Sequence, residues 1–193
     1  HYNMGNALQA DGLFDTAIES YKQAIELDAN WIVPHINLGA TLNDTGNPDA
    51  ALESYHRALE IDPSSSAALT NIGVVMNAKG DPSAAIESYK QAIKVDPNCA
   101  EAHNNLGIRL RDIGELATAI ESFSKALTAD PNYEMAHGNI LFERARICDW
   151  AAIERDRHLI PALGTSTDSG PPFGLMFLED APERHLLRSK LHA

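Results

Sequence analysis

Small and aromatic residues recur along this chain with a period of 34 residues. Each copy has a glycine, a second glycine seven residues later, an alanine five residues further on, an aromatic residue four further on, and another alanine three further on. The first glycines are Gly5, Gly39, Gly73 and Gly107. The aromatic residues are Tyr21, Tyr55, Tyr89 and Phe123. A fixed period of this length is the sequence signature of an array of similar structural units, so it decides the fold before any other feature does.

The second copy shows which elements one unit contains. Its apolar spacing predicts two helices, over residues 33–44 and 49–61. Asn47 and Pro48 are an N-cap residue and a first-turn proline at the start of the later helix. Gly46 is expected to end the earlier helix. The same three signals recur one copy later as Gly80, Asp81 and Pro82.

The recurring small residues predict how the helices pack. A glycine inside a helix, such as Gly39, costs about 1 kcal/mol relative to alanine, so its recurrence needs a reason. Together with Ala51 and Ala58, Gly39 predicts that two helix backbones approach closely. Tyr55 is expected to fill the space between neighbouring repeats. One helix pair cannot bury its apolar face alone, so stacking of repeats supplies the core.

This pattern resembles the tetratricopeptide repeat, in which an aromatic-x-x-Leu-Gly helix is followed by an Ala-x-x-x-Phe helix and a proline. The resemblance implies an all-α, right-handed superhelical solenoid of helix pairs. We expect residues 1–142 to form four near-complete repeats and the start of a fifth, in which Leu141 replaces the glycine. Residues 143–193 are expected to form a transition helix, a Gly/Ser/Pro loop and a short C-terminal helix. We interpret the last part as a linker toward a downstream domain, in an excerpt of a longer protein.

Charge and cysteine content restrict the function class. Fifteen Lys and Arg against 27 Asp and Glu give a net charge of −12. Nucleic-acid binding and anionic membrane binding both need basic surface, so we expect neither partner. Two cysteines, Cys99 and Cys148, make no disulfide framework, which favours the cytoplasm. We find no phosphate loop or nucleophile motif, and therefore expect no catalytic residue and no cofactor in this chain.

One asparagine per repeat is the candidate functional feature, two residues before the first-glycine position. The set is Asn3, Asn37, Asn71, Asn105 and Asn139. Asparagine inside a helix costs roughly 0.7 kcal/mol relative to alanine, so five copies in one phase need an explanation. An amide donates and accepts hydrogen bonds as a peptide unit does, and this phase is expected on the concave wall. We predict a ladder that binds the backbone of an extended peptide; the alternative is that each asparagine bonds within the solenoid.

Two other residue types invite a chemical interpretation. Four histidines share one phase: His1, His35, His103 and His137. Each lies on a different repeat, farther apart than the ligands of one metal ion, and Leu69 takes the slot in the third copy, so we expect packing residues and no metal site. Cys148 is expected to be a buried packing residue beside Trp150 rather than a nucleophile.

The chain also resembles a narrower family, the O-linked N-acetylglucosamine transferases, in particular their bacterial members. The residues that carry this resemblance are Asn-Leu-Gly in the first helices of repeats two and four, the junction Ile147-Cys148-Asp149-Trp150, Pro171-Pro172-Phe173 and Asp180-Ala181-Pro182. The resemblance implies that the five asparagines hold protein substrates. It also implies that transfer of N-acetylglucosamine from its UDP derivative is catalysed by a domain that this chain lacks.

Two other interpretations stay open at this stage. The chain is a free-standing adaptor for protein assembly, with no linked catalytic domain, or it binds acidic peptide tails through a carboxylate clamp. The clamp needs Lys or Arg on the inner face, where this chain has Val33, Ala67, Glu101 and Met135 four residues before the asparagines, so we disfavour it. Nothing in the sequence excludes a homodimer.

Overall fold

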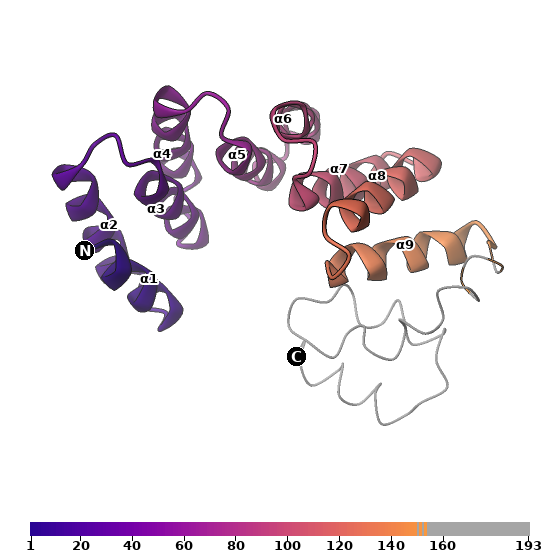
Figure 1. Cartoon of the computed structure of the whole chain (residues 1–193), viewed down its shortest axis with the longest axis horizontal. Coiled ribbons are helices and arrows are strands. Elements are labelled where there is room, and N and C mark those ends of the chain that lie inside the picture. The colour runs from indigo at the N-terminus through magenta and orange to yellow at the C-terminus, as the bar shows by residue number, and fades with distance from the viewer. Residues whose placement is uncertain (150, 152, 154–193) are drawn as a thin grey trace. The chain divides into compact units, whose positions relative to one another are not determined.

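The computed structural model describes residues 1–149, 151 and 153, and this part of the chain contains nine helices and no strand. Figure 1 labels the helices in chain order. They are α1 (Tyr2–Ala10), α2 (Phe14–Leu27), α3 (Ile32–Asp44), α4 (Pro48–Ile61), α5 (Ser66–Ala78), α6 (Pro82–Val95), α7 (Ala100–Asp112), α8 (Leu116–Ala129) and α9 (Glu134–Arg146). The all-α solenoid prediction is confirmed.

The helices form two compact units, unit 1 over His1–Pro97 and unit 2 from Asn98 onward. In unit 1 the pairs are α1 with α2, α3 with α4, and α5 with α6; in addition, α2 contacts α3 and α4 contacts α5. In unit 2, α7 pairs with α8, and α8 contacts α9. The predicted boundary between residues 142 and 143 stays a prediction. The expected linker loop and C-terminal helix lie outside the described residues.

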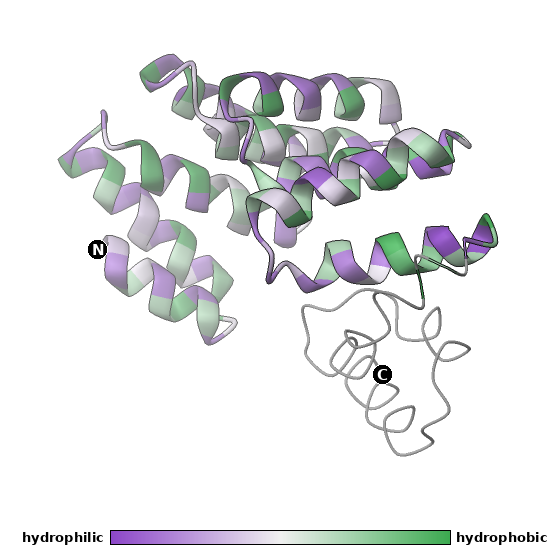
Figure 2. Cartoon of the chain, turned by 45° about the vertical axis from the view of Figure 1, so that its right-hand side comes forward, coloured by the Kyte–Doolittle hydropathy of each residue, from purple (hydrophilic) through white to green (hydrophobic). Residues whose placement is uncertain are grey.

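Helix amphipathicity explains why the pairs stack. Figure 2 shows apolar and polar residues on different sides of the helices. One core cluster of unit 1 joins Ala17, Ile18 and Tyr21 of α2 to Leu38 of α3. A second joins Ala51 and Tyr55 of α4 to Ile72 and Val75 of α5. Each cluster spans two repeats, so the apolar face of one pair is covered by the next.

The glycine of each first helix packs against the aromatic ring of its own repeat. A Cβ built on Gly39 would lie 2.5 Å from Cε1 of Tyr55 and 2.8 Å from its Cζ. Gly5, Gly73 and Gly107 face the aromatic ring of their own repeat in the same way. Glycine is therefore required by the ring of the partner helix, and the close approach is between a backbone and an aromatic side chain. Tyr55 also packs against Ile72 and Val75 of α5, so the expectation that this ring fills the space between repeats is confirmed. The expected close approach of the two helix backbones stays a prediction.

The turn inside each helix pair uses a left-handed residue. Gly12, Gly46, Gly80 and Gly114 have φ between 74° and 86°. Asp81 caps α6 as expected, since its Oδ1 accepts the Ala84 N–H at 2.9 Å. Asn47 does not cap α4 in this way, because its Nδ2 donates to the Thr45 carbonyl at 3.3 Å.

Cys148 occupies this glycine slot after α9. It has φ 58°, the one positive φ at a non-glycine residue in the described part of the chain, and it is exposed. The expectation of a buried packing residue was wrong. The turn geometry fixes the direction of the side chain, and this turn faces solvent.

We expect Cys148→Gly to stabilise the protein. A non-glycine residue in the left-handed region costs about 1–2 kcal/mol, of which the greater backbone entropy of glycine in the unfolded chain cancels part. The free energy of unfolding should rise by about 0.5–1 kcal/mol in urea denaturation. The matched change Gly46→Ala, at φ 79°, should lower it by a similar amount. Destabilisation by Cys148→Gly would contradict the assignment of strain to this residue.

Candidate peptide-binding face

The asparagines lie on the first helices, which form a continuous face in each unit. In unit 1, α1 contacts α3 and α3 contacts α5; in unit 2, α7 contacts α9. Residues spaced i, i+4 and i+7 from one slot share one side of each helix. We call this side of α1, α3 and α5 the first-helix face of unit 1. It consists of Asn3 and Asn6 on α1, Val33, Asn37 and Ala40 on α3, and Ala67, Asn71 and Val74 on α5.

Asn37 is engaged within the scaffold. Its Nδ2 donates to Oδ1 of Asn6 at 3.0 Å and lies 3.5 Å from the Tyr2 hydroxyl, both on the preceding first helix. The Tyr21 hydroxyl lies 2.9 Å from the same Asn6 oxygen and 2.8 Å from Oε1 of Gln9. Burial raises the pKa of Tyr21, so its hydroxyl stays protonated and donates to these oxygens. Asn37 therefore ties repeat two to repeat one.

Asn139 does the same in unit 2. It is only 3% exposed, and its Nδ2 donates to Oδ1 of Asn104 at 3.0 Å. Its own Oδ1 accepts from Arg111 at 3.3 Å. Arg111 in turn lies 3.8 Å from the buried carboxylate of Glu143. Nδ2 of Asn104 is the one fully buried side-chain polar atom without a hydrogen-bond partner among the described residues.

Asn71 differs because the two slots whose side chains contact Asn37 are apolar in the repeat before Asn71. The residues one period after Tyr2 and Asn6 are Ile36 and Ala40, which cannot accept a side-chain hydrogen bond. Asn71 is half-buried and makes no hydrogen bond with any described residue of unit 1. Its amide is therefore a free donor and acceptor on the first-helix face.

The two remaining asparagines are less constrained by neighbours of their own unit. Asn3 is exposed on α1, the first helix of unit 1. Asn105 is half-buried on α7, the first helix of unit 2. The five asparagines of one phase therefore fall into two environments. The signal that separates them is the residue type one period earlier, at the slots of Tyr2, Asn6 and Gln9.

The histidine phase has a structural explanation. Nε2 of His35 donates to the Ala29 carbonyl at 3.1 Å, and Nε2 of His137 lies 2.9 Å from the Pro131 carbonyl, six residues earlier in each case. Each ring thus closes the loop that leads into its own helix. No group of three or more His, Cys, Asp or Glu side chains within residues 1–149 is arranged to hold a metal ion.

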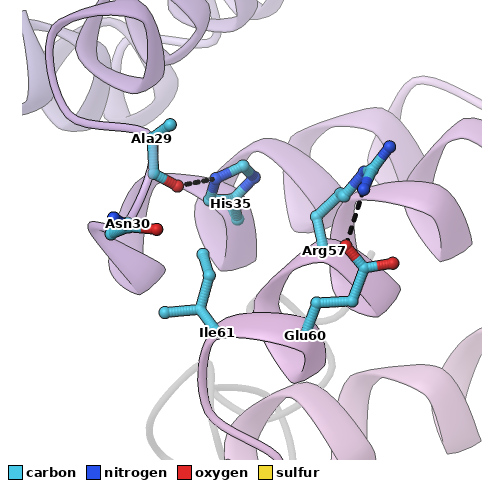
Figure 3. A pocket seen from close by; sticks show the side chains of 6 residues that line it. All are labelled: Ala29, Asn30, His35, Arg57, Glu60 and Ile61. Atoms are coloured by element: carbon cyan, nitrogen blue, oxygen red, sulfur yellow. Dashed lines mark hydrogen bonds and ion pairs between the residues drawn. The ribbon is translucent and has the colours of Figure 1, made fainter.

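A surface pocket of about 370 Å³ adjoins His35 (Figure 3). It is lined by Ala29, Asn30, His35, Arg57, Glu60 and Ile61. Its two charged side chains pair with each other, Arg57 Nη1 with Glu60 Oε2 at 2.6 Å, and His35 bonds the loop carbonyl. Three of its four polar side chains, those of His35, Arg57 and Glu60, are already paired, so it is a weaker candidate than the first-helix face.

Comparisons with known proteins agree with the architecture. Three family models, each described as tetratricopeptide repeat, match residues 1–30, 32–98 and 78–134. A crystal structure of MamA protein is 27% identical, covers 81% of this chain and 90% of its own, and has a TM-score of 0.63. No curated protein matches the chain.

Two more distant structures show the fold alone. A structure titled for the functional characterization of Pseudomonas aeruginosa pilF has a TM-score of 0.78 at 18% identity, over 98% of this chain and 86% of its own. MamA from Desulfovibrio magneticus RS-1 has a TM-score of 0.64 at 21% identity, over 82% and 90%. Among the described residues, no helix has the length and apolar character needed to cross a bilayer.

Proposed function

Because the chain belongs to the tetratricopeptide-repeat family, whose models match residues 1–30 and 32–134, we propose that it is a protein-binding solenoid without catalytic activity of its own. Its first helices hold the main chain of an extended peptide. The observation that carries this proposal is the half-buried Asn71, whose amide has no hydrogen bond within unit 1 and so keeps its donor and acceptor for solvent or a ligand.

The spacing of the helices supports an extended ligand. Neighbouring helices pack about 8–10 Å apart, and an extended peptide advances about 3.3 Å per residue, so one residue in three meets each first helix. A side-chain amide bonds one peptide N–H and one carbonyl, whatever the side chain between them. Binding through Asn71 therefore has little sequence preference of its own. Asn3 and Asn105 are proposed to extend the same ladder. Asn37 and Asn139 join it only if they exchange their hydrogen bonds within the scaffold for bonds to the peptide.

Replacing Asn71 by alanine should weaken peptide binding without weakening the fold. One or two lost hydrogen bonds of about 1 kcal/mol each correspond to roughly a five- to thirtyfold rise in Kd. The midpoint of urea denaturation should stay or rise slightly, because alanine favours the helix and no bond within unit 1 is lost. Fluorescence anisotropy with a labelled, unstructured peptide of about twelve residues measures the first quantity.

Two matched variants complete this experiment. Gln23→Ala removes an exposed amide from α2, away from the first-helix face, and should change neither quantity. Asn37→Ala should lower stability by about 1 kcal/mol through the bonds to Asn6 and Tyr2, in addition to any effect on binding. Equal affinity of the wild type and Asn71→Ala would reject the proposed ladder.

A narrower proposal is that the solenoid recognises substrates for an O-linked N-acetylglucosamine transferase. It is supported by the sequence Ile147-Cys148-Asp149-Trp150 directly after α9 and by the Asn-Leu-Gly segments. The competing proposal is a free-standing adaptor for protein assembly. A glycosyltransferase domain encoded in the same reading frame after Ala193 favours the first, and a stop codon at that place favours the second.

A further inference from the structure

Charge is divided unevenly between the two sets of helices in unit 1. Asp, Glu, Lys and Arg occur once in α1, α3 and α5 taken together, as Asp44, and eleven times in α2, α4 and α6. The exposed residues of the first-helix face are small and apolar or carry an amide, as Val33, Ala67 and Asn3 do. Unit 1 has five basic and thirteen acidic residues, but the residues of the first-helix face carry no charge. We call this uncharged surface the floor.

Carboxylates lie at the C-terminal ends of α1 and α3 and before the N-terminal ends of α3 and α5, whereas Lys79 follows α5. At the C-terminal ends, Asp11 directly follows α1 and Asp44 is the last residue of α3, and both are exposed. At the N-terminal ends, Asp28 and Asp62 lie in the loops before α3 and α5. We call these four residues the acidic rims.

The N-terminal rim is held in place by its loops. Oδ1 of Asp28 accepts the Asn30 N–H at 3.0 Å, and Oδ1 of Asp62 accepts the Ser64 N–H at 2.9 Å and its hydroxyl at 2.7 Å. These bonds from Ser64 lower the pKa of Asp62, which therefore stays ionised well into the acid range.

The C-terminal rim is unfavourable for the isolated protein. The C-terminal end of a helix carries partial negative charge, so a carboxylate there is destabilising and a basic residue is favoured. Neither α1 nor α3 has a basic residue in its last turn, although each has an aspartate at its end. A cationic group from a partner would relieve this repulsion at Asp11 and Asp44.

We propose that the first-helix face of unit 1 binds an extended protein segment whose contacting residues are uncharged and whose flanking residues are lysine or arginine. The inference rests on the proposed function and specifies its ligand. An uncharged floor does not compensate the desolvation of a charged side chain, so charges in the middle of the segment are rejected. The rims, in a unit of net charge −8, attract basic flanks and repel acidic ones.

Four designed peptides of about twelve residues test this selectivity by fluorescence anisotropy with the whole chain. The first has a core of Ser, Thr, Val and Ala with Lys flanks; the second has the same core with uncharged flanks; the third has Glu flanks; the fourth moves the lysines into the core. We expect the first to bind at least about tenfold more tightly than the third or fourth, with the second between. The ratio of the affinity of the first peptide to that of the second should fall severalfold between about 0.1 M and 1 M salt, because the screening length falls from about 10 Å to 3 Å.

Variants locate the effect on the rims. Asp11→Asn with Asp44→Asn should abolish most of the advantage of Lys flanks and should leave the peptide with uncharged flanks unaffected. The control, Glu26→Gln with Glu53→Gln, changes the net charge equally at exposed positions of the second helices and should keep the advantage within about twofold. Melting of the Asp11/Asp44 variant should stay or rise, because two carboxylates leave helix C-terminal ends.

The outcomes separate this inference from the proposed function. Equal binding of all four peptides, still weakened by Asn71→Ala, would overturn the charge selectivity alone. Absence of binding by any peptide would reject both. Sedimentation showing a dimer that Ala67→Glu dissociates would also overturn the inference, because the occupant of the face would then be a second copy of the chain.

Discussion

Replacing Tyr55 by alanine is expected to lower the free energy of unfolding by about 3–5 kcal/mol, the range for removing a large aromatic side chain from a core. Tyr55 is 2% exposed and belongs to the cluster that joins α4 to α5. Its ring also covers Gly39 of α3. One substitution therefore opens a cavity inside repeat two and at its contact with repeat three. Urea denaturation followed by circular dichroism measures the loss.

The same ring makes a double-mutant cycle informative. Gly39→Ala alone should cost about 1–3 kcal/mol, because its Cβ would lie 2.5 Å from the ring of Tyr55. In the Tyr55→Ala protein this steric cost disappears, and the helix preference of alanine adds a small gain. Tyr55→Phe is the matched control and should cost about 1 kcal/mol or less, since Phe123 fills the same slot in α8. Additive effects of Gly39→Ala and Tyr55→Ala would show that the ring is not what excludes a side chain at residue 39.

The second large effect is expected at Glu143 of α9. Its side chain is fully buried, Nη1 of Arg146 lies 3.0 Å from Oε2 and 3.4 Å from Oε1, and Nε of Arg111 lies 3.8 Å from Oε1. Glu143→Ala removes the carboxylate that pairs with Arg146, whereas Arg111 keeps Asp112 at 3.5 Å. Removing one member of a buried ion pair costs about 3–5 kcal/mol, but both arginines are partly exposed, so we expect about 2–3 kcal/mol.

An exposed carboxylate provides the comparison for Glu143. Glu121 of α8 is paired with Lys125 at 2.7 Å on the surface. Lys125 lowers the pKa of Glu121, and Glu121→Ala should leave the urea midpoint unchanged within error. Hydrogen exchange of the α9 amides should accelerate in Glu143→Ala and not in Glu121→Ala. Equal protection of α9 in both variants would contradict a stabilising role of the buried carboxylate.

The sequence period predicted the helices closely, because a turn glycine recurs between the two helices of each of the first four repeats. The helices expected over 33–44 and 49–61 are Ile32–Asp44 and Pro48–Ile61. The role of Gly39 was not predictable in the same way. A recurring glycine indicates a close approach, but the pattern does not distinguish a neighbouring backbone from an aromatic ring.

The exposed, left-handed position of Cys148 could have been predicted from the sequence. It lies 34 residues after Gly114, so the period alone places it in the exposed, left-handed slot of the turn. The residue type suggested burial, since free cysteines are usually buried. Position in the repeat was the better guide.

The five asparagines of one phase were identified from the sequence, but which of them bond within the scaffold was not. Whether an asparagine bonds the scaffold depends on the preceding repeat, where Asn37 finds Asn6 and Asn71 finds Ala40. If the asparagines served only a peptide ladder, replacing Asn37, Asn71 and Asn105 together by alanine would leave melting nearly intact. The bonds of Asn37 now lead us to expect a loss of stability from that triple variant.

The most direct test of the central claim is an NMR titration that follows the side-chain NH₂ resonances of the asparagines as the Lys-flanked peptide is added. A free amide that binds a peptide main chain changes its chemical shift and exchanges more slowly with water. We predict that Asn71 responds first and most strongly, that Asn37 changes less, and that the Gln23 amide on α2 does not change. Shifts confined to the second helices, or none at Asn71 under saturating peptide, would contradict the assignment of the first-helix face as the binding surface.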